Sequence, residues 1–441
     1  MTELEKLEAY SKVLSLLEEH HEFFSKSLPL IASENVCSPA VREAVASDFM
    51  HRYAEGWPGE RLYAGCRYID EVEKIAIELG RDVFKAEFVD VRPISGVVAN
   101  LVAYCTFARP GDMMIALAIP HGGHISHGKE KWGGTAGVVR GLEVERYEFN
   151  EEEHEIDVDA TARKLRRLEA DTGKRPRLFM LGASVFLFPH PVKEVRRLAD
   201  EYGAYLVYDA AHVAGLIAGG RFQDPLREGA DCMTMSTHKT LAGPQHGMVA
   251  SWSRYAERLK QVAFPGLLSN HHLHHVAGLA IALAEAKAFY REYAGAIIRN
   301  AKTLAEAMYE LGIDVLYEHR GFTESHTIVA DVTKYMDGRT AEEKLERAGI
   351  IVNRNLIPKD YRLKTDHRKP SGIRLGVQEL TRLGMNESEM KHVAELIADV
   401  IVRNREPEKV AKDVEDFRTQ YRKVHYCFES AVGAYDYIRI R

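Results

Sequence analysis

The stretch DCMTMSTHKTLAGPQHGMVA, residues 231–250, carries a single lysine where an apolar run gives way to a turn. Lys239 lies between hydroxyl side chains and an imidazole, and Gly243-Pro244 turns the chain before a second apolar run begins. An ammonium group is costly to bury without a partner, but a lysine with a lowered pKa can form a Schiff base with an aldehyde. A surface lysine whose stem lies along apolar side chains is the alternative interpretation.

A carboxylate ends an earlier apolar run, about thirty residues before this lysine. Residues Tyr205–Asp209 are apolar up to their final acid, and His212 follows shortly after. An acid at one strand end and a lysine at another are what a pyridoxal phosphate enzyme needs. The carboxylate keeps the pyridinium nitrogen protonated, and the lysine carries the aldehyde. The two strand ends therefore predict a pyridoxal phosphate site.

Strand and helix patterns alternate from about residue 85 to residue 250, which is typical of an α/β fold with a doubly wound, mostly parallel sheet. Such sheets bind ligands beyond the carboxyl ends of their strands. The polar residues that follow predicted strands are Ser95, His124, Ser184, Asp209, His212 and Lys239. We expect the charged residues 143–177 to form an exposed linker and a helix.

Three parts are predicted along the chain. Residues 1–38 form an N-terminal helical arm, because apolar residues recur there at helical spacing. Residues 39–285 form the large sheet domain. Residues 286–441 form a smaller α+β domain, joined to the large one by an apolar helix expected over residues 277–293.

Residues 51–68, HRYAEGWPGERLYAGCRY, are rich in glycine and aromatic side chains. Aromatic rings around Glu55 could raise the pKa of its carboxyl into the range of a general acid or base. A glycine-rich surface loop whose aromatic residues merely pack is the alternative.

A serine and a glycine, Ser95-Gly96, begin a predicted helix. The free N–H groups of a helix start and the serine hydroxyl can bind a phosphate group, although any helix capped by serine has this pattern. In the segment HGGHISHG, residues 121–128, an imidazole could stack on a flat cofactor. No carboxylate or cysteine completes a metal-binding set there, so we predict no metal.

An arginine interrupts the apolar run SGIRLG, residues 371–376. A buried Arg374 implies an anionic partner, and a substrate carboxylate bound through both guanidinium edges fits best. An ion pair with a structural Asp or Glu is the alternative.

The composition bounds the class of protein. The 441 residues carry a net charge of −6, which gives no basic footprint for nucleic acid. Five widely spaced cysteines are typical of a reduced, cytoplasmic chain. No apolar run reaches the length of a membrane span, and no signal peptide is apparent, so we expect a cytoplasmic protein without membrane contact.

The chain resembles the serine hydroxymethyltransferases, especially the archaeal-type branch, over nearly its whole length. Six motifs carry the resemblance: LPLIASEN (28–35), YAEGWPGERLYAGC (53–66), HGGHISHG (121–128), DAAHVAGL (209–216), STHKTLAGP (236–244) and SGIRLG (371–376). The resemblance implies an aspartate-aminotransferase-like, fold-type I architecture. It also implies reversible transfer of the serine hydroxymethyl group to tetrahydrofolate or tetrahydromethanopterin, giving glycine.

The resemblance also implies a role for each matching residue. Lys239 would bind pyridoxal 5'-phosphate covalently, Asp209 would pair with the pyridinium nitrogen, and His124 would stack on the ring. The residues near the ring oxygen would be His212 and Ser184, and those at the phosphate Ser95, Gly96, Ser236 and His238, with Tyr53 and Gly266 of a partner subunit. The substrate carboxylate would bind Arg374 and Ser33.

Glu55 and Tyr63 would act at the reacting hydroxymethyl group across a dimer interface, so the resemblance implies a homodimer. The chain departs from the family pattern at Val97, Leu62, Gln245-His246 and Leu267-Leu268. Two other functions are compatible with the residues: a pterin-independent aldolase or transaldolase acting on threonine or α-methylserine, and a cofactor-free binding protein.

Overall fold

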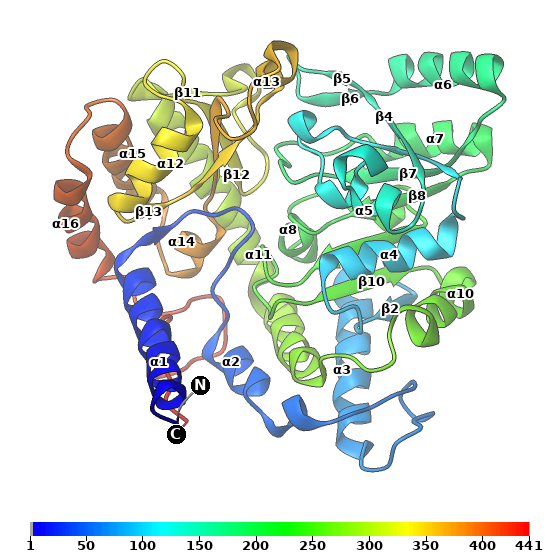
Figure 1. Ribbon diagram of the computed structural model, residues 1–441, viewed down its shortest axis with the longest axis horizontal. Coiled ribbons are helices and arrows are strands. Elements are labelled where there is room, and N and C mark those ends of the chain that lie inside the picture. Colours follow the sequence, from blue (N-terminus) through cyan, green and yellow to red (C-terminus); the bar gives the residue numbers. More distant parts are fainter. Residues whose placement is uncertain (1–2, 441) are drawn as a thin grey trace.

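A seven-stranded sheet forms the centre of the larger part of the molecule (Figure 1). The computed structural model describes residues 3–440. The strands of this sheet, in spatial order, are β2 (Phe88–Asp90), β10 (Gly247–Ser251), β9 (Cys232–Ser236), β8 (Tyr205–Asp209), β7 (Pro176–Gly182), β3 (Met113–Ala116) and β4 (Glu143–Arg146). Strand β10 is antiparallel to both neighbours, and β9, β8, β7, β3 and β4 run parallel. The predicted α/β class and mostly parallel sheet are confirmed.

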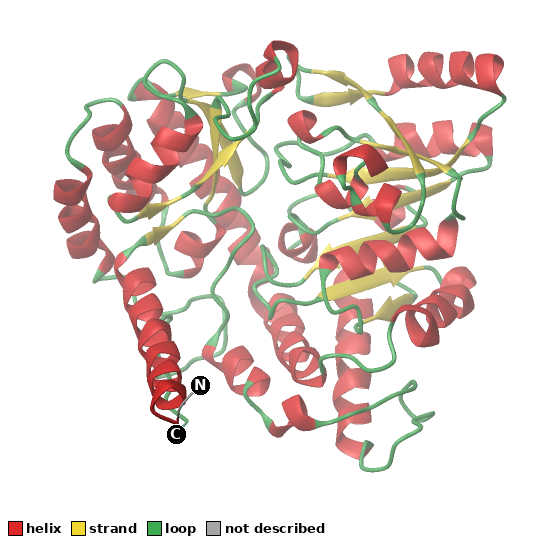
Figure 2. Ribbon diagram, in the orientation of Figure 1, coloured by secondary structure: helices red, strands yellow, loops and turns green. Residues whose placement is uncertain are grey.

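The central strands are apolar because both faces of the sheet are covered. Leu178 and Met180 of β7 belong to one core cluster, whereas Phe179 and Leu181 belong to the other. Figure 2 shows helices on the two sides of the strands. The helices of this part are α2 (Pro39–Val45), α3 (Arg67–Phe84), α4 (Gly96–Phe107), α5 (Thr135–Val138), α6 (Val158–Thr172), α7 (Val192–Tyr202), α8 (Ala214–Ala218), α9 (Pro225–Glu228) and α10 (Ala256–Gln261).

A second, antiparallel sheet lies in the C-terminal part. Its strands, in spatial order, are β11 (Asp314–Val315), β12 (Thr327–Asp331), β15 (Gly372–Gly376) and β14 (Asn353–Asn355). The helices of this part are α12 (Gly338–Arg347), α13 (Pro358–Leu363), α14 (Gln378–Arg382), α15 (Glu387–Ile401) and α16 (Pro407–Arg418). This arrangement is the small α+β unit that the sequence predicts.

One helix, α11 (Leu273–Glu310), joins the two parts. It contacts α2, α3 and α8 on one side of the molecule and α14, α15, β11 and β12 on the other. The helix is longer than the predicted range 277–293 because its apolar face continues past Tyr293. The predicted domain boundary between residues 285 and 286 falls inside this continuous helix, so the division of the chain stays a prediction.

The N-terminal segment packs on the C-terminal part. Helix α1 (Glu3–Lys26) contacts α16, and β1 (Leu28–Pro29) pairs in parallel with β13 (Ile350–Ile351). Residues 1, 2 and 441, which belong to the predicted arm and small domain, lie outside the described residues. Within residues 3–440, no helix is long and apolar enough to cross a bilayer.

The expectation of an exposed linker at the start of residues 143–177 is wrong. Strand β4 pairs with β3 at the edge of the main sheet, and β5 (Glu148–Asn150) forms an antiparallel pair with β6 (Glu155–Asp157). Of the four β4 residues, only Val144 is buried. An edge strand with one buried side chain lacks the apolar pattern by which the inner strands are recognised.

Candidate functional site

Lys239 lies just beyond the carboxyl end of β9. Its Nζ donates a hydrogen bond to Ser236 Oγ at 2.9 Å. Burial lowers the pKa of the Lys239 ammonium group to about 8, and the nearby Asp209 carboxylate opposes this effect. Asn35 Nδ2 donates to the Lys239 backbone carbonyl at 2.8 Å, which fixes the turn. The result is a buried amine that loses its proton more easily than an exposed lysine does.

Asp209 ends β8, the strand next to β9. Its Oδ1 accepts a hydrogen bond from the Ala211 N–H at 2.9 Å, and its Oδ2 accepts from Asn100 Nδ2 at 2.8 Å and pairs with His127 Nε2 at 3.0 Å. Burial opposes ionisation of the carboxyl, but His127, His124 and Asn100 outweigh it and hold the pKa of Asp209 well below its usual range. Asp209 is therefore a buried negative charge.

Two of these partners were not predicted from the sequence. Asn100 lies on the first turns of α4, and Thr234 Oγ1 donates to its Oδ1 at 2.6 Å, which orients the amide toward Asp209. His127 lies in the HGGHISHG segment, for which a site was predicted without a separate role for this ring. The signal for His127 was present, whereas nothing in the sequence distinguished Asn100 from other polar helix residues.

His124 lies near Asp209 on the loop that follows β3. Its Nδ1 accepts a hydrogen bond from the Ser126 N–H at 3.1 Å and lies 2.7 Å from Ser126 Oγ. Burial and the neighbouring His127 lower the pKa of His124 to about 4, so the ring is neutral at physiological pH. A neutral, half-buried imidazole fixed through one nitrogen can present its face to a flat ring.

The start of α4 lies against the end of β9. Ser95 caps the helix, with its Oγ accepting from the Val98 N–H at 3.2 Å. A Cβ atom at Gly96 would lie 2.3 Å from Ser236 Oγ, so only glycine allows this approach. The first-turn N–H groups of a helix have no partner within the helix.

The donors at this helix start fit the phosphate of pyridoxal phosphate. They comprise N–H groups at the positive end of the helix dipole and the hydroxyls of Ser95 and Ser236. His238 Nδ1 is buried without a partner among the described residues. Burial and Lys239 lower the pKa of His238 to about 4. These groups fit a phosphate by their chemistry, since all can donate hydrogen bonds to an anion.

Arg374 lies on β15 of the small sheet and is 9% exposed. Its Nη1 donates to the Ser184 carbonyl at 2.7 Å and its Nε donates to Asn353 Oδ1 at 3.0 Å. Burial lowers the pKa of Arg374 to about 10. Within residues 3–440, no carboxylate forms an ion pair with this guanidinium, which disfavours the structural ion pair considered from the sequence.

Ser33 lies on the segment after β1. Gln378 Nε2 donates to the carbonyls of Ile31 and Glu34 at 2.8 and 2.6 Å, and the Gly376 N–H donates to the Leu30 carbonyl at 2.8 Å. These bonds attach the segment beside the end of β15.

His212 and Ser184 follow the ends of β8 and β7. His212 Nδ1 lies 3.4 Å from His326 Nε2, which in turn lies 3.1 Å from the Ala32 carbonyl oxygen. Burial, with the charges of Lys239 and Arg374, lowers the pKa of His212 well below its ordinary value. His326 was not predicted from the sequence, because its contact with His212 depends on how the two sheets pack.

The remaining predicted residues, Tyr53, Glu55, Tyr63 and Gly266, form a separate group that we name the outer patch. The Tyr53 and Tyr63 rings lie 4.8 Å apart and are 43% and 47% exposed. Tyr53 Oη lies 3.2 Å from Ser269 Oγ, on the segment that follows Gly266. Within the part of the chain that the structure describes, no hydrogen bond or ion pair joins the outer patch to Lys239 or Asp209.

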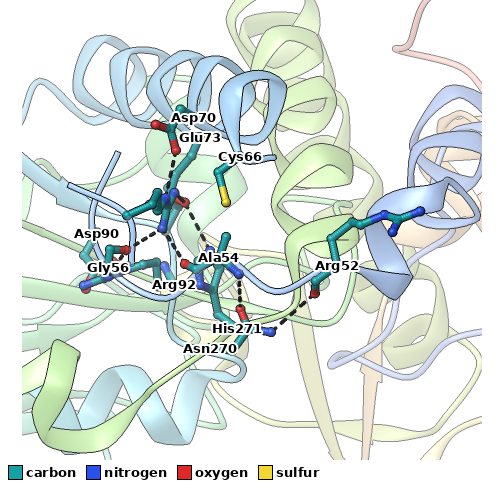
Figure 3. A network of polar contacts seen from close by, with 12 residues as sticks. Arg52, Ala54, Gly56, Cys66, Asp70, Glu73, Asp90, Arg92, Asn270 and His271 are labelled. Carbon is teal, nitrogen blue, oxygen red and sulfur yellow. Dashed lines mark hydrogen bonds and ion pairs between the residues drawn. The ribbon is translucent and has the colours of Figure 1, made fainter. Parts of the chain in front are cut away.

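A buried polar network holds the loop of the outer patch in place (Figure 3). Arg61 donates to Asp70 Oδ1 at 2.8 Å, to Glu73 Oε2 at 2.5 Å and to the Ala54 carbonyl at 2.7 Å. His271 Nε2 lies 3.2 Å from the same oxygen of Glu73.

The network also connects the loop to the segment before α11 and to the end of β2. The Ala54 N–H donates to Asn270 Oδ1 at 3.0 Å, and Arg92 donates to the Gly56 carbonyl at 3.3 Å. The Arg92 guanidinium lies 3.2 Å from the centre of the Trp57 ring. The exposed tyrosines therefore stand on a loop with a fixed backbone, which is what a preformed contact surface requires.

Comparisons with known proteins point to one family. Residues 7–397 match the family model described as "Serine hydroxymethyltransferase". The chain is similar to the serine hydroxymethyltransferase of Nitrosopumilus maritimus, at 54% identity over 441 residues that cover 100% of both chains. It is also similar to the serine hydroxymethyltransferase of Methanopyrus kandleri, at 55% identity over 98% of this chain and 99% of the relative. The enzyme of Pyrococcus furiosus is 50% identical over 95% of this chain and 96% of the relative.

Proposed function

The chain belongs to the serine hydroxymethyltransferase family, and we propose that Lys239, Asp209 and Arg374 form the centre at which it carries out the family's reaction. It is an enzyme that interconverts serine and glycine and transfers the one-carbon unit to a tetrahydropterin, with pyridoxal phosphate as cofactor. Neither the matched family nor these relatives support the pterin-independent aldolase considered from the sequence.

The observation that carries the assignment of the site is that a buried amine and a buried carboxylate lie at the ends of neighbouring strands, close enough for the carboxylate to act on the pKa of the amine. Bound pyridoxal phosphate supplies an aldehyde for the lysine and an electron-withdrawing ring that stabilises negative charge next to the substrate amino group. The charged Asp209 would hold a proton at the ring nitrogen. His127 and Asn100 support this role, because their hydrogen bonds keep the carboxyl ionised.

The phosphate and ring would be held by the residues around them. Ser95, Gly96, Ser236 and His238 would bind the phosphate at the start of α4. The neutral His124 would lie on the ring face, and His212 and Ser184 would lie near the ring oxygen. The amine of Lys239, with its lowered pKa, would accept and return a proton at the substrate nitrogen.

Arg374 would bind the substrate carboxylate, with Ser33 beside it. Its present partners are a carbonyl and an amide oxygen, both neutral, so the guanidinium charge stays available for an anion. Holding the carboxylate would also limit rotation about the bond between the substrate nitrogen and its Cα. That rotation decides which of the bonds to Cα would stand perpendicular to the cofactor ring.

A homodimer would supply the outer patch of one subunit to the other. Glu55 and Tyr63 would act at the hydroxymethyl group, and Tyr53 and Gly266 at the phosphate, all from the partner subunit. The exposure of the tyrosines and the fixed loop beneath them support this arrangement. A cytoplasmic location is also proposed, since Cys37, Cys66, Cys105, Cys232 and Cys427 are all free thiols.

Serine turnover measured with tetrahydrofolate, with tetrahydromethanopterin and with neither tests the function. We expect fast turnover with one of the carriers, and equal rates in all three assays would refute the transfer. Mixing the inactive variants Lys239→Ala and Glu55→Gln tests the shared site. Subunit exchange should restore about a quarter of wild-type activity, because about half of the dimers are mixed and each has one intact site. No gain over the separate variants would refute the shared site.

A further inference from the structure

Three histidines lie together outside the residues assigned to the cofactor and substrate. His246 precedes β10, His272 precedes α11 and His275 lies in its first turn. One ring nitrogen of each lies within 4.8 Å of one ring nitrogen of each of the others. No part of the proposed reaction uses these three side chains.

His246 is fully buried and fixed through one nitrogen. Its Nε2 donates to the Val91 carbonyl at 2.7 Å, so the other nitrogen, Nδ1, carries the lone pair. That Nδ1 is buried and has no hydrogen-bond partner among the described residues. Histidine ligands of metal ions commonly donate their second nitrogen to a backbone carbonyl in this way, which sets the tautomer and the ring orientation.

His275 offers a second free nitrogen. Its Nδ1 is also buried without a partner in the described part of the chain, and the ring forms a hydrogen bond with the backbone of Gln245. The unpartnered Nδ1 atoms of His246 and His275 can therefore each offer a lone pair to a metal ion.

We propose that His246, His272 and His275 bind one divalent zinc ion, with water as the fourth ligand. Three imidazole nitrogens suit zinc, whereas magnesium and calcium take oxygen ligands. Zinc–nitrogen bonds of about 2.0–2.1 Å place tetrahedral ligands about 3.4 Å apart. The ring nitrogens now lie within 4.8 Å of one another, so they must move closer together to bind the ion. The side chains of the exposed His272 and the half-buried His275 can rotate to do so, while the Val91 hydrogen bond holds His246 in place.

The ion would connect two segments that are far apart in the sequence. His246 ends the turn that begins at Lys239, and His272 directly follows Asn270 and His271 of the network in Figure 3. Zinc would therefore attach the lysine turn to the segment that supports the outer patch. The proposal does not depend on the assigned reaction, because none of the three ligands has a role in it.

Zinc titration of the metal-stripped holoenzyme by calorimetry tests the proposal. We expect one zinc ion per chain, and a melting temperature raised by roughly 3 °C at a hundredfold excess of zinc over its dissociation constant. Cobalt in place of zinc should give the visible absorption of a tetrahedral site. The variant His272→Asn should weaken zinc binding by at least about tenfold. Loss of a residue that only hydrogen-bonds to a metal ligand already weakens metal binding by about tenfold or more, and loss of a ligand itself should cost no less. Since His272 is exposed, this substitution leaves the fold intact.

His274→Asn is the matched control, because His274 neighbours His275 but stands outside the group. Its zinc affinity should equal that of the wild-type enzyme. Absence of stoichiometric zinc binding, binding that persists in both His272→Asn and His246→Asn, or an equal loss in His274→Asn would each overturn the proposal. The last result would mean that the histidine-rich tract chelates metal without a defined site.

Discussion

Replacing Arg374 by alanine should lower kcat/KM for serine by between about thirtyfold and a few thousandfold. Arg374 is almost fully buried and its two partners are neutral oxygens, so the substrate carboxylate would be its counter-ion. Without the guanidinium, that carboxylate would be buried unpaired, which costs about 2–5 kcal/mol. At about 1.36 kcal/mol for each factor of ten, this cost gives the expected loss.

Arg374→Lys should fall between the alanine variant and the wild type. Lysine keeps the charge but loses the planar pair of donors. Loss of one charge-assisted hydrogen bond costs about 1.5–3 kcal/mol, which is about a ten- to 150-fold loss in kcat/KM.

The assay compares serine with serinol, which has an alcohol in place of the carboxylate. The wild-type enzyme should prefer serine strongly, and the alanine variant should lose most of that preference while its serinol activity changes little. Arg354→Ala is the matched control, because Arg354 lies on the neighbouring strand β14, is partly exposed and pairs with Glu342. A serine kcat/KM within threefold of wild type in Arg374→Ala, or an equal loss for serinol, would refute the reasoning.

Three further predictions concern the cofactor side of the site. Lys239→Ala should abolish repeated turnover and the borohydride-dependent labelling of the chain, which mass spectrometry detects; an unchanged rate would contradict its role. Gly96→Ala should weaken pyridoxal phosphate binding by about fivefold to 150-fold, as measured by a fluorescence titration of the apoenzyme. The loss corresponds to about 1–3 kcal/mol of overpacking against Ser236. Full affinity would show that the start of α4 and the end of β9 can move apart freely. Asn100→Ala should raise the pKa of Asp209, since a hydrogen bond to the charged carboxylate is lost. The stability that the charged carboxyl contributes is lost as the pH falls through its folded-state pKa. The acid unfolding midpoint of the variant, followed by circular dichroism, should therefore lie at higher pH than that of the wild type. An unchanged midpoint would mean that His127 alone keeps the carboxyl charged.

The chemistry of the site could be read from the sequence where a polar residue ends an apolar run. Asp209, Lys239 and Arg374 each interrupt or end such a run, and the physical cost of burying a charge makes them conspicuous. The mostly parallel sheet could also be predicted, from the alternation of strand and helix patterns. Its inner strands are covered on both faces and must be apolar, so they stand out as apolar runs in the sequence.

The partners of these residues could not be read in this way. Asn100, His326 and Asn353 act through contacts between segments far apart in the chain, and each is an ordinary polar residue in its local sequence. Strand β4 escaped detection because an edge position needs only one buried side chain. These features depend on how the elements pack, which local patterns do not contain.

The 38 residues of α11 extend for about 57 Å at 1.5 Å per residue, and helices of the larger part as well as strands of the small sheet pack against them. A continuous helix of this length couples the two parts mechanically. Unwinding its middle would strip covering side chains from both cores at once, so the halves of the chain should melt in one transition and should not survive as separate fragments cut near residue 285.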